Sequence, residues 1–163
     1  MNKFILLGTN SIIALLILLI SSCKTSSYAN YDYKSKCLGS ELDGSQTIKA
    51  WGKGSGRKDA VEQAKKNAVR DIVFNGIQDG QQGCKLKPLL LEVNAEEKYQ
   101  TYFNAFFTDG GEFTKFVSLK DERLSSQIFR EKVKGKDYSV YSVVVRVMNE
   151  DLKNKLIKDQ ILK

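Results

Sequence analysis

Histidine is missing from this 163-residue chain. It is the side chain most often used as a general base and as a metal ligand, and it is the middle member of the usual nucleophilic triads. Two neighbouring carboxylates, Glu96 and Glu97, make a poor catalytic pair, because side chains face each other on a helix only three or four residues apart. With no complete catalytic constellation in the sequence, we expect a protein that is not an enzyme, with no catalytic residue, no metal and no cofactor.

Proline is also scarce, with one residue against 12 glycines, which argues against a disordered or low-complexity chain. Hydrophobic residues make up 42% of the chain and charged residues 28%, as is ordinary for folded proteins. At about 100 to 200 residues per domain, there is room for one domain and a leader. The net charge of +7 suits anionic lipid headgroups or cell-wall polymers, although a basic balance also serves solubility. We expect no nucleic acid partner.

Long hydrophobic runs are confined to the N-terminus. Lys3 is followed by apolar residues, an unbroken apolar run spans Ile12–Ile20, and small residues come last, which is the layout of a signal peptide. The alternative is a transmembrane helix, but such a helix needs about 20 mostly apolar residues, and this stretch is interrupted at Gly8–Ser11. We therefore predict that residues 1–22 are a signal peptide.

The leader ends in Ile20-Ser21-Ser22-Cys23, which resembles a lipobox, the sequence that directs lipidation of a cysteine. This resemblance implies that Cys23 becomes the lipidated N-terminus and binds the membrane, since each buried lipid methylene contributes about 0.8 kcal/mol. Residues 23–40 are then a lipid anchor and flexible tether, and residues 41–163 a single α+β domain. No aspartate follows Cys23 to retain the protein at the inner membrane, and the acidic cluster of surface-exposed lipoproteins is missing. By this resemblance we expect an outer-membrane protein whose domain faces the periplasm.

Two adjoining segments carry the clearest structural patterns. Residues 46–53 alternate, with Ile48 and Ala50 on one side, and this predicts a strand. Residues 57–74 have apolar residues at close to the 3.6-residue period of an amphipathic helix. Within this helix the small residues Ala60, Ala64 and Ala68 form a smooth strip that can lie close to a sheet.

The remaining segments complete a mixed fold. We predict a helix over residues 95–107 capped by Asn94, a strand over 113–119, and a hairpin of 127–133 with 138–148, in which the second strand is central. A last helix is predicted to be capped by Asn149 and to place four apolar residues inward: Leu152, Leu156, Ile157 and Ile161. The expected fold is an α+β two-layer sandwich of helices on a small, mostly antiparallel sheet.

The segment Gly52-Lys53-Gly54-Ser55-Gly56 joins the first strand to the first helix, where glycine-rich loops can hold phosphate. The dinucleotide-binding pattern needs a third glycine where Arg57 stands, and the Gly-Lys-Ser/Thr end of a phosphate-binding loop is missing. We therefore favour a tight turn whose glycines need positive φ angles. The alternative is a ligand site made by Trp51, Lys53, Gly54, Gly56 and Arg57, with a basic helix flank that is otherwise a solvated face.

Cys37 and Cys84 remain once Cys23 is lipidated, and the periplasm is oxidising. We predict a disulfide between them, with two separate buried thiols as the alternative. Closing a loop of this length would contribute about 3 to 4 kcal/mol to stability.

Ala50-Trp51-Gly52-Lys53-Gly54, followed by the helix with Ala60, Ala64 and Ala68, resembles the signature of a bacterial lipoprotein family. That family includes the twenty-kilodalton membrane-associated lipoprotein of Helicobacter and the N-terminal domain of the flagellar accessory protein FlgT. Val73–Ile77 and Asp109–Gly111 make the chain similar to uncharacterised lipoproteins of the Bacteroidetes type. The resemblance implies a non-catalytic envelope accessory or scaffold protein that binds other envelope proteins. The alternative is a binding module for an anionic cell-wall or nucleotide ligand.

Overall fold

The computed structural model describes residues 33–163, apart from 82–83, 120–131 and 135–137. The predicted signal peptide and Cys23 lie outside the described residues. Within the described ranges, no helix is both long enough and apolar enough to cross a bilayer.

One sheet organises the domain. It contains β1 (Lys36–Ser40), β2 (Gln46–Gly54), β3 (Asp79–Gly80), β4 (Val117–Ser118), β5 (Lys132–Lys134) and β6 (Ser139–Val147). The strand order is β3-β1-β2-β6-β4, and β5 also pairs with β6. Every pairing is antiparallel except that of β1 with β3, so the prediction of a mostly antiparallel sheet is confirmed.

Strands β2 and β6 are the centre of this sheet. They pair along their whole lengths, from Gln46 opposite Val147 to Gly54 opposite Ser139. The described part of the predicted hairpin is confirmed, because Lys134 of β5 lies opposite Ser139 of β6. The predicted tether is wrong at its end, since β1 falls within residues 23–40 and pairs with β2, with Lys36 opposite Lys49.

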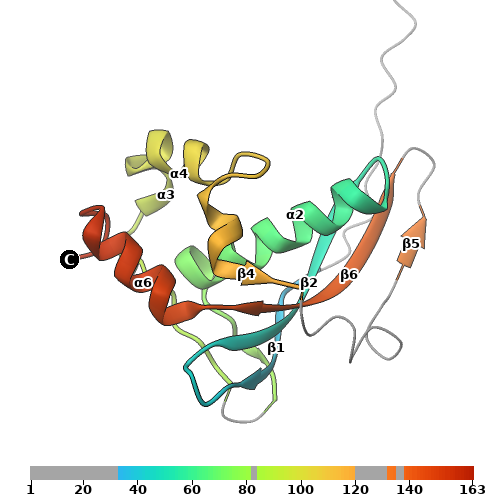
Figure 1. Cartoon of the computed structure of the whole chain (residues 1–163), viewed down its shortest axis with the longest axis horizontal. Coiled ribbons are helices and arrows are strands. Elements are labelled where there is room, and N and C mark those ends of the chain that lie inside the picture. The colour runs from blue at the N-terminus through green and yellow to red at the C-terminus, as the bar shows by residue number, and fades with distance from the viewer. Residues whose placement is uncertain (1–32, 82–83, 120–131, 135–137) are drawn as a thin grey trace, which may run out of the picture. The chain divides into compact units, whose positions relative to one another are not determined.

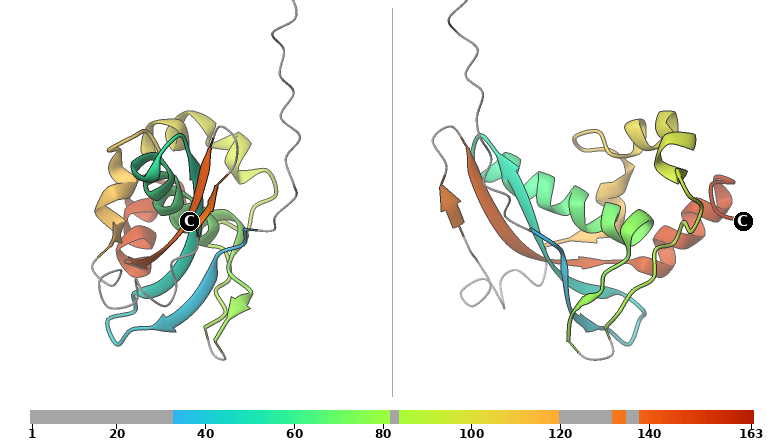
Figure 2. Two further views of the ribbon diagram at one scale, coloured as in Figure 1. Left: turned by 90° about the vertical axis from the view of Figure 1, so that its right-hand side faces the viewer. Right: turned by 180° about the vertical axis from the view of Figure 1, so that it is seen from behind.

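The helices pack on one another and on the sheet, as expected for an α+β sandwich. Helix α2 (Arg57–Arg70) lies along the sheet and continues as a π-helical turn over Asp71–Asn75. Helices α3 (Ala95–Lys98), α4 (Gln100–Phe106) and α6 (Asn149–Lys158) gather around the C-terminal half of α2 (Figures 1 and 2).

Helix α2 lies unusually close to β2. The three alanines of its strip are fully buried, as predicted. A Cβ atom on Gly52 would stand 1.9 Å from the carbonyl oxygen of Ala60 and 2.3 Å from the backbone nitrogen of Ala64. A Cβ on Gly54 would stand 2.5 Å from the nitrogen of Ala60. Because these glycines and alanines have no side chain or a small one, the backbone of α2 can lie directly against that of β2.

The expectation that the loop glycines need positive φ angles is wrong. Gly56 has a φ of −140°, and neither Gly52 nor Gly54 belongs to the positive-φ glycines of the described chain. Two of the three glycines are there because the helix backbone occupies the volume that a side chain would need.

The predicted helix over residues 95–107 is broken in two. Tyr99, with φ −106° and ψ 26°, separates α3 from α4. Asn94 is not the side-chain cap that was predicted, because it adopts a left-handed conformation with φ 63° and its side chain makes no capping hydrogen bond. Asparagine tolerates this conformation better than most residues, so the same residue type that indicates a cap also suits a turn.

The predicted strand over residues 113–119 is mostly a helical turn. A 3₁₀-helix covers Glu112–Phe116, and only Val117–Ser118 of β4 is extended. Phe113 and Phe116 are both buried. A spacing of three residues places both rings on one side of a 3₁₀-helix, whereas in a strand they would point to opposite faces.

Helix α6 also departs from prediction at two positions. Asn149 is its first residue and makes no side-chain cap. Leu152, Leu156 and Ile161 are buried as predicted, but Ile157 is 46% exposed. Because an α-helix has 3.6 residues per turn, the Ile157 side chain is rotated by about 100° from that of Leu156 and lies off the inner face.

Candidate functional site

The residues proposed from the glycine loop do not converge in the structure. Gly54 faces α2, so Trp51 and Lys53 lie on the opposite face of β2, because successive strand residues alternate. The Trp51 ring lies 5.1 Å from that of Tyr33, and Lys53 Nζ lies 4.1 Å from the centre of the Tyr138 ring. The structure therefore places these candidates on two sides of the sheet.

The first turn of α2 contains a carboxylate, that of Asp59. Gly56 is the residue that precedes the helix, Arg57 is exposed in its first turn, and the Ser55 hydroxyl donates a hydrogen bond to the Asp59 carboxylate. The negative charge of Asp59 in the first turn disfavours a second anion near the positive end of the helix dipole. The geometry of this described loop gives no support to phosphate binding.

Two cations on the basic flank of α2 form ion pairs within the molecule. Lys66 Nζ lies 2.6 Å from Asp109, and the Arg70 guanidinium lies 2.7 Å from Glu96. Both acids belong to residues 95–109, which contain α3 and α4 and are called the α3–α4 segment from here on. Two cations of this flank therefore form ion pairs with the α3–α4 segment at the surface, where Arg70 and Glu96 are each about half exposed.

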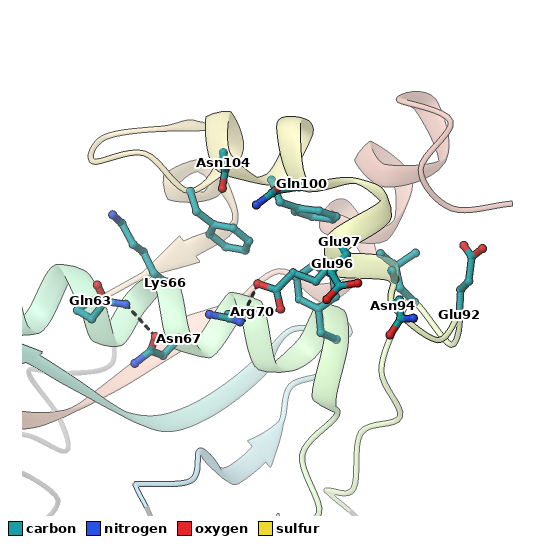
Figure 3. A pocket seen from close by; sticks show the side chains of 15 residues that line it. Gln63, Lys66, Asn67, Arg70, Glu92, Asn94, Glu96, Glu97, Gln100 and Asn104 are labelled. Atoms are coloured by element: carbon teal, nitrogen blue, oxygen red, sulfur yellow. Dashed lines mark hydrogen bonds and ion pairs between the residues drawn. The ribbon is translucent and has the colours of Figure 1, made fainter. Parts of the chain in front are cut away.

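Between α2 and the α3–α4 segment lies a groove of about 680 Å³ (Figure 3). The α2 wall presents polar side chains, and the opposite wall presents amides and carboxylates from α3 and α4. These wall residues are Gln63, Lys66, Asn67, Arg70, Glu96, Glu97, Gln100 and Asn104. The volume is in the usual range for ligand pockets, about 300 to 1,000 Å³.

No protein-family model, curated protein or solved structure matches this chain.

The floor of the groove is apolar. It is made by the rings of Phe74, Phe103 and Phe107 together with Leu90. Phe74 meets Phe103 edge to face with ring centres 4.7 Å apart, and the centres of Phe103 and Phe107 are 5.9 Å apart. Phe103 and Leu90 are buried, whereas Phe74 and Phe107 are only partly covered. These two partly covered rings leave apolar surface for a bound molecule.

Most charges around the groove are neutralised in pairs. The hydrogen bond from Lys66 lowers the pKa of Asp109, and the hydrogen bond to Glu92 raises the pKa of Lys98. We call the following three contacts the rim ion pairs: Arg70–Glu96 at 2.7 Å, Lys66–Asp109 at 2.6 Å and Lys98–Glu92 at 2.6 Å.

The two walls differ in how far their amides are already engaged. Asn67 Nδ2 donates to the carbonyl oxygen of Trp51 at 2.7 Å, and Gln63 Nε2 donates to Asn67 Oδ1 at 3.0 Å. Across the groove, Gln100 and Asn104 make no side-chain hydrogen bond within the described part of the chain. The α4 wall therefore offers unused donors and acceptors to a ligand.

The lining side chains are mainly amides, charged groups and apolar residues. The groove-lining residues include no serine, threonine, cysteine, tyrosine or aspartate. Among the described residues no three potential metal-ligating side chains gather at one place. Planar amides, paired charges and rings instead suit a molecule held by hydrogen bonds and apolar contact.

Sequence reasoning missed this groove because its walls are separated in the chain and only packing brings them together. A weak signal was present. Gln63 and Asn67, and likewise Gln100 and Asn104, are amides spaced by four residues, which puts each pair on one side of a helix. Such spacing indicates a shared face but not what lies opposite.

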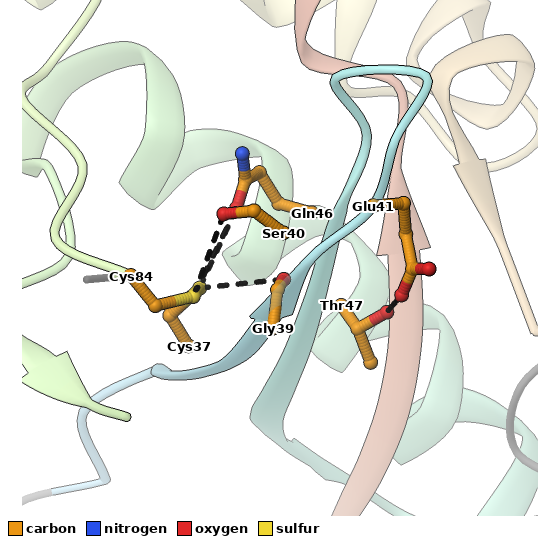
Figure 4. Close-up of a disulfide and its surroundings, with 7 residues drawn as sticks. All are labelled: Cys37, Gly39, Ser40, Glu41, Gln46, Thr47 and Cys84. Atoms are coloured by element: carbon orange, nitrogen blue, oxygen red, sulfur yellow. Dashed lines mark hydrogen bonds between the residues drawn. A yellow bond between two sulfur atoms is a disulfide. The ribbon is translucent and has the colours of Figure 1, made fainter. Parts of the chain in front are cut away.

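Cys37 and Cys84 form the predicted disulfide, with Cα atoms 5.7 Å apart (Figure 4). Both residues are buried, so the bond is part of the core. Close by, the Ser40 hydroxyl donates to Gln46 Oε1 at 2.8 Å. The bond ties β1 to the segment that follows β3 and is a structural element of the domain.

Proposed function

We propose that this protein is a non-catalytic lipoprotein, attached to the periplasmic side of the outer membrane through Cys23. It acts there as an envelope accessory or scaffold protein. The observation that carries this proposal is the groove between α2 and the α3–α4 segment, through which the domain holds another component of the envelope.

Two features support this combination. The signal-peptide layout and the lipobox-like sequence before Cys23 favour a membrane anchor. A groove with an apolar floor and unengaged amides suits reversible binding, and the absence of histidine from the sequence leaves few routes to catalysis. An anionic cell-wall or nucleotide ligand is the weaker hypothesis, because the cations of the groove already have acidic partners.

Site-specific photo-crosslinking in intact envelopes tests this proposal. The photoreactive amino acid benzoylphenylalanine replaces Asn104 in the groove or, as a control, the exposed Asn154 on α6. We expect light-dependent adducts of discrete mass from position 104 and not from position 154. The adducts should disappear when Cys23→Ser blocks lipidation and so keeps the chain from reaching the outer membrane. Equal crosslinking from both positions, or none from position 104, would contradict a partner in the groove.

A further inference from the structure

The amides of the groove repeat at a distance that suits an extended chain. Gln100 and Asn104 lie four residues apart on the α4 wall, as do Gln63 and Asn67 on the α2 wall (Figure 3). At 1.5 Å per residue, a separation of four residues is about 6 Å along a helix. An extended peptide repeats every two residues, or about 6.6 Å, so successive amides can meet successive peptide groups of the same chain.

The floor fits the side chains of such a peptide. In an extended chain alternate side chains point to one face. Those facing inward would meet the partly covered rings of Phe74 and Phe107 and the aliphatic side chain of Leu90. The floor is therefore suited to apolar side chains of a peptide.

A groove carboxylate that is unpaired among the described residues favours a peptide with a positive charge. The rim ion pairs neutralise their own members, which leaves Glu97 as the lining carboxylate with no hydrogen bond or ion pair in the described chain. A lone carboxylate beside an apolar floor attracts a cationic side chain.

Resting on the proposed function, we infer that the groove binds an extended peptide segment of another envelope protein, with apolar residues at alternate positions and a lysine or arginine that reaches Glu97. Gln100 and Asn104 hydrogen-bond the backbone of this segment. Phe74 and Phe107 contact its inward side chains.

Fluorescence anisotropy on the full chain, purified in detergent, tests this inference. The probe is a fluorescein-labelled pool of capped octapeptides with leucine, valine or phenylalanine at alternate positions and one lysine between them. We expect saturable binding that Gln100→Ala with Asn104→Ala weakens at least tenfold, which corresponds to about 1.4 kcal/mol. Both positions are exposed and alanine is the better helix former, so the double variant should fold. Asn154→Ala is the matched control and should bind as the parent does.

A second substitution tests the contribution of the Glu97 charge with little change in the shape of the groove. Glu97→Gln should weaken binding of the lysine pool about three- to tenfold and leave unchanged the binding of a pool with glutamine in place of lysine. Glu150→Gln on α6 serves as its control, since Glu150 is also exposed.

Three outcomes would overturn the inference. They are no saturable binding of the peptide pool, binding that the Gln100→Ala and Asn104→Ala changes leave intact, and binding of an N-acetylglucosamine tetramer in place of peptide. If the pool fails while position 104 still crosslinks a protein in envelopes, the peptide inference is wrong and the proposed scaffold function stands. If position 104 gives no crosslink, the proposed function itself fails.

Discussion

Gly52 lies where a single added methyl group has no room, because its Cβ would overlap the backbone of Ala60 and Ala64 in α2. We predict that Gly52→Ala lowers the free energy of unfolding by about 2 to 3 kcal/mol, since overpacking forces the helix off the strand. Urea denaturation followed by circular dichroism measures this loss.

Gly56→Ala is the control for this prediction. Nothing lies within 4 Å of a Cβ at Gly56, and its φ of −140° is open to any residue. The substitution should be neutral or slightly stabilising, within about 1 kcal/mol. If both variants unfolded at the same urea concentration, close packing would not be the reason for Gly52.

The two asparagines predicted as helix caps show the limit of residue-scale reasoning. Asn94 has a left-handed backbone and makes no capping hydrogen bond. Asn149 lies inside the first turn of α6, and its Oδ1 is buried with no hydrogen-bond partner among the described residues. Asparagine suits caps and turns alike, so its presence near a helix start does not say which position it takes.

At the scale of elements, one polar contact joins α4 to the end of α6. The Tyr102 hydroxyl donates to Asp159 Oδ2 at 2.6 Å, and Lys155 pairs with the same carboxylate at 2.8 Å. The hydrogen bond from Lys155, followed by that from Tyr102, lowers the pKa of Asp159. Burial, followed by the hydrogen bond to Asp159, raises the pKa of Tyr102.

We predict that Tyr102→Phe lowers the free energy of unfolding by about 1 to 2 kcal/mol at neutral pH, through loss of a hydrogen bond to a charged group. The raised pKa also sets a pH dependence. Folded Tyr102 keeps its proton above pH 10, where an unfolded tyrosine loses it, so the contribution is complete below about pH 10 and declines as pH rises towards the folded pKa. Urea midpoints at about pH 8 and 10.5 measure this decline.

The decline should be smaller in Tyr102→Phe than in the parent protein. Tyr99→Phe is the matched control, because Tyr99 is a half-buried tyrosine of the same segment that makes no contact with Asp159. An equal alkaline decline in Tyr102→Phe and in the parent would show that the contact with α6 does not govern the titration.

At the scale of the whole molecule, the disulfide closes a loop of 47 residues. We predict that Cys37→Ala with Cys84→Ala lowers the free energy of unfolding by about 3 to 4 kcal/mol, chiefly because the unfolded chain gains freedom. Urea denaturation measures the loss. Unfolded but unreduced parent protein should not react with maleimide at either cysteine, and labelling of both would mean separate thiols.

The lipid anchor is the second prediction at this scale. Cys23→Ser should leave an unprocessed precursor that takes up no labelled fatty acid, because the acceptor thiol is gone. The control is Cys37→Ala, which removes a cysteine of the folded domain and should remain processed and labelled. Processed, labelled protein from Cys23→Ser would rule out the predicted anchor.

The sequence alone determined the features that repeat locally. Alternation located β2, the 3.6-residue period with the alanine strip located α2, and the apolar second strand of the hairpin located β6 at the centre of the sheet. Each pattern reports one face of one element, which is enough to establish its type and the side that it buries. The pairing of Cys37 with Cys84 was also predictable, from the expectation of an oxidising compartment in which two thiols readily form a disulfide.

Tertiary structure alone decided which faces meet. Local sequence patterns did not predict the break at Tyr99, the 3₁₀-helix at Glu112–Phe116 or the contact of Arg70 with Glu96. The sequence indicated that Gly52 is a turn residue, whereas in the structure the backbone of α2 lies against it. The groove belongs to the same class, since its two walls are distant in sequence and hydrophobic periodicity holds no information about distant partners. Packing sets that geometry, because only the folded chain brings those surfaces within contact distance.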